Sequence, residues 1–252
     1  GLTAEGRFLE AAAVSQATSN LPEICSRVCP QERLCEGMCT LSERTDPIPI
    51  GAIEKFINEY AFAHGAIEIP RAMPNGFRVA VVGSGPAGME AARVAALRGH
   101  DVTLYDKAHT AGGLLPMASF IKSDSPDEIP LLLTWLQKQI SDLNVKTRYG
   151  KEVTTELIKK EAPDAVVLAV GGKPKDPPLK GSKVISTEEL KHKASGFVRL
   201  LGPDAMASLT KIFLPTGKKG VVVGSDLAAL EAVEFLVHRG KEVTLVDTAP
   251  QI

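Results

Sequence analysis

The chain has 252 residues, of which 44% are apolar and 23% charged, and its formal net charge is −1. This composition is typical of a globular protein with a sizeable core, and the near-zero charge argues against nucleic acid as a partner. No apolar run is long enough to span a membrane, and the first residues lack the regions of an export signal. We therefore expect a cytoplasmic protein that binds neither nucleic acid nor membranes.

The first quarter of the chain is predicted to be helical around a cysteine-rich segment. Apolar residues recur at helical spacing over residues 3–19 and again over residues 52–62. Between these helices lie all four cysteines of the chain, at positions 25, 29, 35 and 39. Residues 64–76 hold two prolines and two glycines, which predicts a linker.

From residue 77 the pattern changes to alternating strands and helices. We expect strands at 78–82, 101–105, 145–149 and 165–170, and helices at 87–97, 126–143 and 155–160. Residues 220–231 then repeat the pattern of residues 79–90. The predicted fold class is α/β, with a helical domain at 1–68, a nucleotide-binding domain at 77–215, and the first half of another at 216–252.

The first glycine-rich turn, Gly-Ser-Gly-Pro-Ala-Gly at residues 83–88, predicts a dinucleotide site. Gly83 permits a tight turn after the strand, Gly85 lets the backbone approach a pyrophosphate, and Gly88 lets the helix pack closely. Amides at the start of the helix face the phosphates. Asp106 ends the second strand, where a carboxylate accepts hydrogen bonds from a ribose diol. The predicted contacts of this site are Gly83, Gly85, Pro86, Ala87, Gly88 and Asp106.

Two further segments resemble the two-dinucleotide-binding flavoprotein superfamily. One is Gly112-Gly113-Leu114 shortly after Asp106, and the other is the apolar strand that ends in Gly171-Gly172. The resemblance implies a Rossmann-like domain that binds FAD. It also implies that Gly113, Leu114 and Gly171 lie beside the flavin nucleotide, and that the backbone of Val153 contacts the adenine.

The second glycine-rich turn, residues 224–229, occupies the place of the NAD(P)H motif of that superfamily. Gly224 begins it, but Asp226 stands where a glycine normally leaves room for the pyrophosphate. A carboxylate there adds bulk and a like charge, so a nucleotide-like fold without tight binding is the alternative. Asp247 ends the following strand and favours a free 2′-hydroxyl, hence NADH over NADPH.

The spacing of the cysteines matches neither a zinc ribbon nor a thioredoxin motif. Thiolates with the adjacent Pro30 suit an iron–sulfur cluster better, while a zinc site and reduced buried thiols remain alternatives. A cluster built from this chain alone would need Cys25, Cys29, Cys35 and Cys39 together.

Residues 21–39, followed by residues 50–56, resemble the N-terminal domain of the glutamate synthase small subunit and of dihydropyrimidine dehydrogenase. In that family two 4Fe–4S clusters sit in a helical domain before the FAD domain. By position, Cys29, Cys35 and Glu54 would bind one cluster and Cys39 the other, which leaves Cys25 without a cluster. The family places a further four-cysteine run upstream, so we expect neither cluster to be completed by this chain.

Residues 77–252 also resemble the FAD domain of 2-enoate reductases and trimethylamine dehydrogenase, through residues 113–117, 130–136 and 200–203. Together the resemblances imply an oxidoreductase that passes electrons from NAD(P)H through FAD to iron–sulfur clusters and another oxidoreductase subunit or domain. No catalytic side chain is expected, because the five histidines are scattered. The alternative function is an FAD-binding scaffold without nicotinamide turnover.

Overall fold

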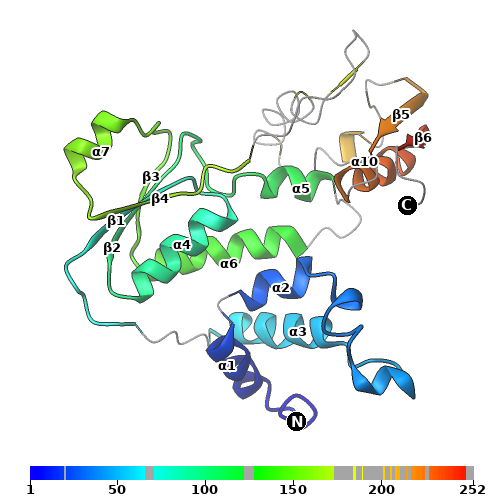
Figure 1. Cartoon of the computed structure of the whole chain (residues 1–252), viewed down its shortest axis with the longest axis horizontal. Helices are drawn as coiled ribbons and strands as arrows, with labels where there is room; N and C mark the ends of the chain where they lie inside the picture. The colour runs from blue at the N-terminus through cyan, green and yellow to red at the C-terminus, as the bar shows by residue number, and fades with distance from the viewer. Residues whose placement is uncertain are drawn as a thin grey trace.

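The computed structural model describes residues 1–19, 21–65, 71–121, 128–172, 184, 185, 189, 201, 205, 208–210, 214, 217–224 and 227–247. Among them, no helix is long and apolar enough to cross a membrane. The chain begins with a group of helices, continues into a parallel sheet with helices, and ends in a second, smaller β–α–β unit (Figure 1). This order confirms the predicted α/β architecture.

Helices α1 (Phe8–Thr18) and α3 (Ile50–Ala63) pack against each other and form the small apolar core of the N-terminal part. The ring of Phe8 meets Tyr60 edge-on, with centroids 5.2 Å apart. The predicted helix at 3–19 starts later than expected, because residues before Phe8 form hydrogen-bonded turns instead. The buried residues of this core are Ala11, Ala12, Ile57 and Ala61.

Helix α2 (Pro22–Val28) carries Cys25 and packs on α3. A buried ion-pair network joins the two helices: the guanidinium of Arg27 lies 2.6 Å from Glu23 and 2.5 Å from Glu59. The side chains of Arg27 and Glu23 are 3% and 2% exposed. Burial raises the pKa of the Glu23 carboxyl, and the charge of Arg27 opposes that rise. Removing one partner of such a buried pair typically costs about 3–5 kcal/mol. The network therefore fixes α2 on α3.

Between α2 and α3 the chain runs through two short 3₁₀ turns, η1 (Gln31–Arg33) and η2 (Thr40–Glu43). Glu36 holds this segment to α3, because its carboxylate accepts a hydrogen bond of 3.0 Å from the Gly51 amide. Cys35 and Cys39 lie in this segment.

The sheet of the central part has four parallel strands in the order β3-β2-β1-β4. They are β1 (Arg78–Val82), β2 (Asp101–Tyr105), β3 (Lys146–Arg148) and β4 (Ala165–Leu168). In the register, Val81 lies opposite Leu104 on one side and Val167 on the other. All four strands lie within the ranges predicted from the sequence.

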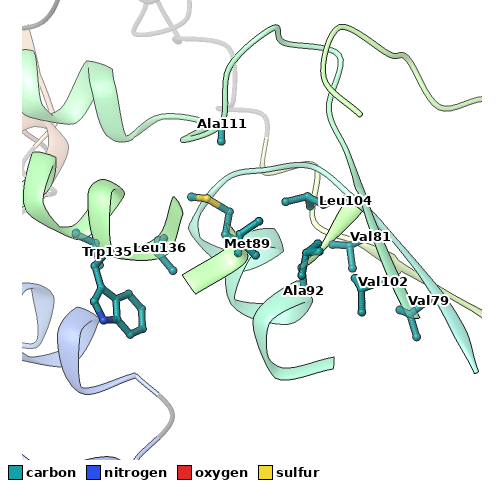
Figure 2. Close-up of a cluster of buried hydrophobic side chains, with 12 residues drawn as sticks. Val79, Val81, Met89, Ala92, Val102, Leu104, Ala111, Trp135 and Leu136 are labelled. Atoms are coloured by element: carbon teal, nitrogen blue, oxygen red, sulfur yellow. The ribbon is translucent and has the colours of Figure 1, made fainter. Parts of the chain in front are cut away.

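Helices α4 (Pro86–Leu97) and α6 (Glu128–Asp142) cover this sheet and close its core. Figure 2 shows Met89 and Ala92 of α4 between Leu136 of α6 and the side chains of β1 and β2. Burying a large apolar side chain contributes about 1.5–3 kcal/mol. Two shorter helices complete this part: α5 (Leu115–Ile121) comes after β2, and α7 (Thr155–Glu161) comes after β3. The core residues with no measurable exposure are Val81, Met89, Ala92, Leu104 and Leu136.

The described part of the predicted linker, residues 71–76, is bound to the end of α4. The amide of Ala72 donates to the carbonyl of Leu97 at 2.8 Å, and the amide of Asn75 donates to the carbonyl of Gly99 at 3.0 Å. The guanidinium of Arg71 donates to the carbonyl of Asp142 at the end of α6. These bonds attach the second half of the linker to the central α/β part of the chain.

The last unit contains β5 (Lys219–Val223), α10 (Leu227–Val237) and β6 (Glu242–Val246), with its two strands parallel. Figure 1 shows it beyond α5, on the opposite side from α7. Phe235 of α10 packs edge-on against Phe120 of α5, with ring centroids 5.1 Å apart. This unit confirms that the β–α–β pattern occurs twice.

Candidate functional site

The glycine-rich turn between β1 and α4 requires glycine at two positions, one for its backbone angle and one for close packing. Gly83 has φ +104°, and a Cβ added there would collide with the carbonyl of Ala169. A Cβ added to Gly88 would collide with the carbonyl of Gly83, so the helix packs directly on the turn. The amide of Gly83 donates to the carbonyl of Tyr105 at 2.8 Å, which connects the turn to the end of β2.

Gly85 differs from these two glycines, because neither its backbone nor its neighbours require glycine. Its φ is −71°, which any residue adopts, and a Cβ there would come no closer than 3.9 Å, to Gly113. The space in front of Gly85 is therefore open. Helix α4 begins at the next residue, and the amides of its first turn have no carbonyl one turn earlier. An open space in front of such amides fits a pyrophosphate.

Asp106 follows β2 and is held against the glycine-rich turn. One oxygen of its carboxylate accepts hydrogen bonds from the amide of Ser84 at 2.6 Å and from the hydroxyl of Ser84 at 2.7 Å. The other oxygen accepts from the amide of Ala108 at 2.8 Å. The sequence placed Asp106 correctly beside the turn, but it did not indicate Ser84, a buried side chain, as its partner.

The segments that follow β1, β2 and β4 meet at the carboxyl ends of these strands. The amide of Gly112 donates to the carbonyl of Ser84 at 2.9 Å, which places Gly113 and Leu114 beside the turn. The amide of Ala169 donates to Val82 at 2.8 Å, and Gly171 follows two residues later. Ligands of parallel α/β sheets bind at this edge, beyond the carboxyl ends of the strands.

The segment after β3 also reaches Asp106. The amide of Lys151 donates to the carbonyl of Asp106 at 2.8 Å, and Val153, partly buried, lies two residues further along. Tyr149 is a neighbour that the sequence did not indicate: burial and the charge of Asp106 raise the pKa of its hydroxyl. Tyr149 lines an open cleft of about 660 Å³ between α6 and β3. The lining of this cleft includes none of residues 83–88 of the glycine-rich turn.

The second glycine-rich turn has the same backbone at its start. Gly224 has φ +119°, and its amide donates to the carbonyl of Val246 at 2.9 Å. Asp247 follows β6 and is partly buried. Asp226, on which the predicted weakening of nicotinamide binding depends, lies outside the described residues.

Cys25 and Cys29 form one pair in the N-terminal part. Cys29 ends α2, and its amide donates to the carbonyl of Cys25 at 3.1 Å. Burial, followed by the neighbouring Cys29 and the charge of Glu54, raises the pKa of the Cys25 thiol. Burial also raises the pKa of Glu54, whose carboxylate accepts a hydrogen bond of 3.4 Å from the hydroxyl of Ser15. Glu54 therefore lies near Cys25.

Cys35 and Cys39 have different surroundings. Cys35 is exposed. Hydrogen bonds from the backbone of Ile48, Leu41 and Ser42 lower the pKa of the Cys39 thiol, which favours the thiolate that binds metals. All four thiols are free. Within the described ranges, no three or more ligand side chains converge on a single metal position. The donors thus have the right chemistry for a cluster, but they do not form a complete ligand set.

Comparison with known protein families gives two matches. Residues 77–252 match the family described as pyridine nucleotide-disulphide oxidoreductase. Residues 1–66 match the family described as dihydropyrimidine dehydrogenase domain II, 4Fe–4S cluster. These matches confirm the predicted fold class, the flavin-dependent oxidoreductase class, and FAD, a nicotinamide and a 4Fe–4S cluster as its cofactors.

Individual relatives agree with these families. The small chain of a glutamate synthase (NADPH) from Azospirillum brasilense is 48% identical over 117 residues, which are 45% of this chain and 24% of the relative. A glutamate synthase (NADH) from Saccharomyces cerevisiae is 36% identical over 230 residues, which are 88% of this chain and 10% of the relative. The chain spans about a quarter of the length of the first curated relatives that it matches.

A solved structure of 2-naphthoyl-CoA reductase matches with a TM-score of 0.54 and 29% identity, over 79% of this chain and 28% of that chain. This likeness confirms the resemblance to flavoprotein reductases, which rested on the glycine-rich turn and the segment after β2. The family match over residues 77–252 covers more than half of the chain. The chain therefore belongs to the pyridine nucleotide-disulphide oxidoreductase family.

Proposed function

We propose that this chain accepts electrons from NADH at a bound FAD and delivers them to iron–sulfur clusters and a partner subunit or domain. FAD, when bound, supplies the conversion of a two-electron hydride into single electrons, which amino-acid side chains do not provide. The protein itself binds and orients the cofactors. The relative from Azospirillum brasilense is named a small chain, which supports a partner subunit.

The observation that carries the proposal is the open space at Gly85. Gly83 and Gly88 are glycines because the backbone requires them, whereas Gly85 has an ordinary φ of −71° and room for a side chain. Its lack of a side chain is therefore best explained by a ligand that needs the space. We propose that the pyrophosphate of FAD lies there, bound by amides of Ala87 and Gly88 at the start of α4.

The remaining contacts follow from the same edge of the sheet. We propose that Asp106, fixed by Ser84, accepts hydrogen bonds from the ribose of FAD, and that Gly113, Leu114 and Gly171 lie beside the flavin nucleotide. Val153 would offer its backbone to the adenine. Pro86 sets the first turn of α4 and leaves no unpaired amide of its own.

The cysteine segment is proposed as the electron-accepting part. We propose Cys29, Cys35 and Glu54 as ligands of one cluster and Cys39 as a ligand of a second, with Cys25 as a neighbouring thiol. The position of Glu54 near Cys25, on the helix that leads directly into Cys29, and the lowered pKa of Cys39 support this assignment. The proposed domain boundaries stay at 1–68, 77–215 and 216–252.

The choice of nicotinamide rests on the second β–α–β unit, because the names of the two glutamate synthases cite NADPH and NADH respectively. We propose that Gly224 begins the turn that binds the nicotinamide cofactor. Asp247, at the end of β6, would repel a 2′-phosphate and accept hydrogen bonds from a free ribose diol.

The test is reconstitution of the purified chain with FAD, compared between the natural chain and Gly85→Asp. We expect the natural chain to retain FAD through gel filtration and to release FAD, rather than FMN, on heating. Gly85→Asp should lose FAD but keep the unfolding midpoint of the apoprotein, because the fold leaves room for its side chain. Gly85→Ala adds bulk without charge, so its FAD retention should lie between that of the natural chain and that of Gly85→Asp.

Two results would contradict the proposal. One is equal FAD retention by the natural chain and Gly85→Asp. The other is an absence of flavin bleaching when NADH or NADPH is added anaerobically to the FAD-loaded protein, which would favour a scaffold over an oxidoreductase.

A further inference from the structure

Trp135 lies where the helical N-terminal part meets the flavin-binding part. It belongs to α6 and is 4% exposed. Figure 2 shows its indole extending from α6 on the side of α2, whereas the next side chain, Leu136, points toward Met89. Ile24 of α2 and Phe62 of α3 pack against the core cluster that contains Trp135. Trp135 and Leu136 of α6 thus face different partners: Trp135 lies on the side of α2, and Leu136 faces α4.

The indole is held from the flavin side by a charged pair. The guanidinium of Arg93, on α4, lies 5.4 Å from the centroid of the Trp135 ring. Arg93 is itself held by Glu90 at 2.7 Å, and its side chain is only 6% exposed. A cation over an aromatic face is attracted to it, more strongly when water is excluded. The ring is therefore fixed before α2 contacts it.

Shape rather than hydrogen bonding defines this contact. The buried indole N–H of Trp135 has no hydrogen-bond partner in the part of the chain that the structure describes. Another aromatic ring at position 135 would therefore keep most of the contact, while a small side chain would leave a cavity between α6 and α2.

We propose that Trp135 is a positioning residue that docks α2, the helix that carries Cys25 and ends at Cys29, onto the flavin-binding part. The proposal rests on the proposed function, in which electrons pass between these two parts. Arg27 fixes α2 on α3, and Trp135 fixes α2 on α6, so α2 is held on both sides. The distance between the flavin and the cysteine segment then depends on this contact.

The first test measures hydrogen exchange of the full chain with FAD bound, for the natural protein, Trp135→Ala, Trp135→Phe and the control Leu136→Ala. The quantity compared is the ratio of the exchange rate of the α2 amides to that of the α4 amides. We expect Trp135→Ala to raise this ratio about tenfold, because undocking exposes α2 while α4 stays folded. Trp135→Phe should restore the natural ratio, and Leu136→Ala should not raise it, since it loosens the core around α4 rather than the contact with α2.

The second test separates two electron-transfer steps in the FAD-loaded protein, assembled with the partner subunit or domain that completes its clusters. Trp135→Ala should leave the rate of flavin bleaching by NADH unchanged but slow the transfer of electrons to the clusters about tenfold, because misplaced partners react slowly. Trp135→Phe should recover that rate.

The outcomes for the two proposals are distinguishable. Failure of NADH to bleach the natural protein would contradict the proposed function, and the exchange ratio would still report on docking. An unchanged α2-to-α4 ratio in Trp135→Ala, or an equal rise in Leu136→Ala, would overturn the role of Trp135.

Discussion

The two β–α–β units share the geometry of their glycine-rich turns. Gly83 and Gly224 have φ angles of +104° and +119°, and their amides donate to the carbonyls of Tyr105 and Val246 at 2.8 and 2.9 Å. In both units the second strand pairs in parallel with the first over five residues. A similar local sequence thus produces a similar local backbone, whatever surrounds it.

The two units differ in burial. β1 lies between β2 and β4, and Ala80 on it is 3% exposed. The equivalent residue on β5, Val221, is 67% exposed, and in the described chain β5 pairs with β6 alone. The comparison teaches that the motif determines the turn, whereas neighbouring strands and helices determine the core. Stability and cofactor binding can therefore be separated by substituting equivalent positions.

The largest expected contrast is between Leu104→Ala and Leu245→Ala. Leu104 is fully buried between β1 and α4, so its truncation should lower the free energy of unfolding by about 3 kcal/mol. The equivalent Leu245 is only partly buried, so its truncation should cost about 1 kcal/mol. Urea unfolding measures both. Equal losses would mean that the two cores are equally packed.

The next contrast exchanges glycine and alanine at equivalent positions of the two turns. Gly88→Ala should destabilise the protein by about 2 kcal/mol and remove FAD, because its Cβ would overlap the carbonyl of Gly83. Ala229→Gly should cost at most about 1 kcal/mol, the usual cost of glycine in a helix. Thermal unfolding with and without FAD measures these effects. A stable, FAD-bound Gly88→Ala would show that α4 can shift away from the turn.

A smaller effect is expected for nicotinamide binding. Asp226 occupies in the second unit the place of Gly85 in the first, so Asp226→Gly should strengthen NADH binding about tenfold, or roughly 1.4 kcal/mol. NADH should be preferred over NADPH in both forms, because Asp247 is unchanged. Stopped-flow titration of flavin bleaching gives the constants. Preference for NADPH would show that Asp247 does not contact the ribose.

The smallest contrast concerns surface ion pairs at the strands of the two units. Lys146 lies 2.8 Å from Asp101, and Lys219 lies 3.0 Å from Glu242, and all four side chains are exposed. Replacing either lysine by alanine should change the free energy of unfolding by less than about 0.5 kcal/mol, less still in high salt. A double-mutant cycle for each pair measures the coupling. A coupling above about 1 kcal/mol would indicate that the pair is not screened by solvent.

The sequence predicted the long and strongly patterned elements well. The strands 78–82 and 101–105 agree with β1 and β2 residue for residue, because short apolar runs end there at Gly83 and Asp106. Helices α2 and α5 were not predicted, although Pro22 and Glu23 are favourable at a helix start. Seven residues show little of a helical period, and α2 lacks the side-chain cap that Thr154 gives to the equally short α7.

The candidate site was predicted in its backbone and less well in its side chains. The turn and Asp106 follow from residue spacing and Gly113 from the resemblance, and the structure brings them together. That Ser84 holds Asp106 depends on a rotamer, which spacing does not determine. The grouping of the cysteines depends on how the segment folds between α2 and α3, so the ligand assignment stays a prediction.

The burial of Trp135 has a consequence for optical spectroscopy. It is the single tryptophan among 252 residues, so all tryptophan emission of the chain comes from α6 where this helix contacts α2. With 4% of its surface exposed, the indole should emit at short wavelength, and water that enters this contact should shift the emission to the red. The natural chain thus contains an intrinsic fluorescent reporter at its inter-domain junction and needs no added label.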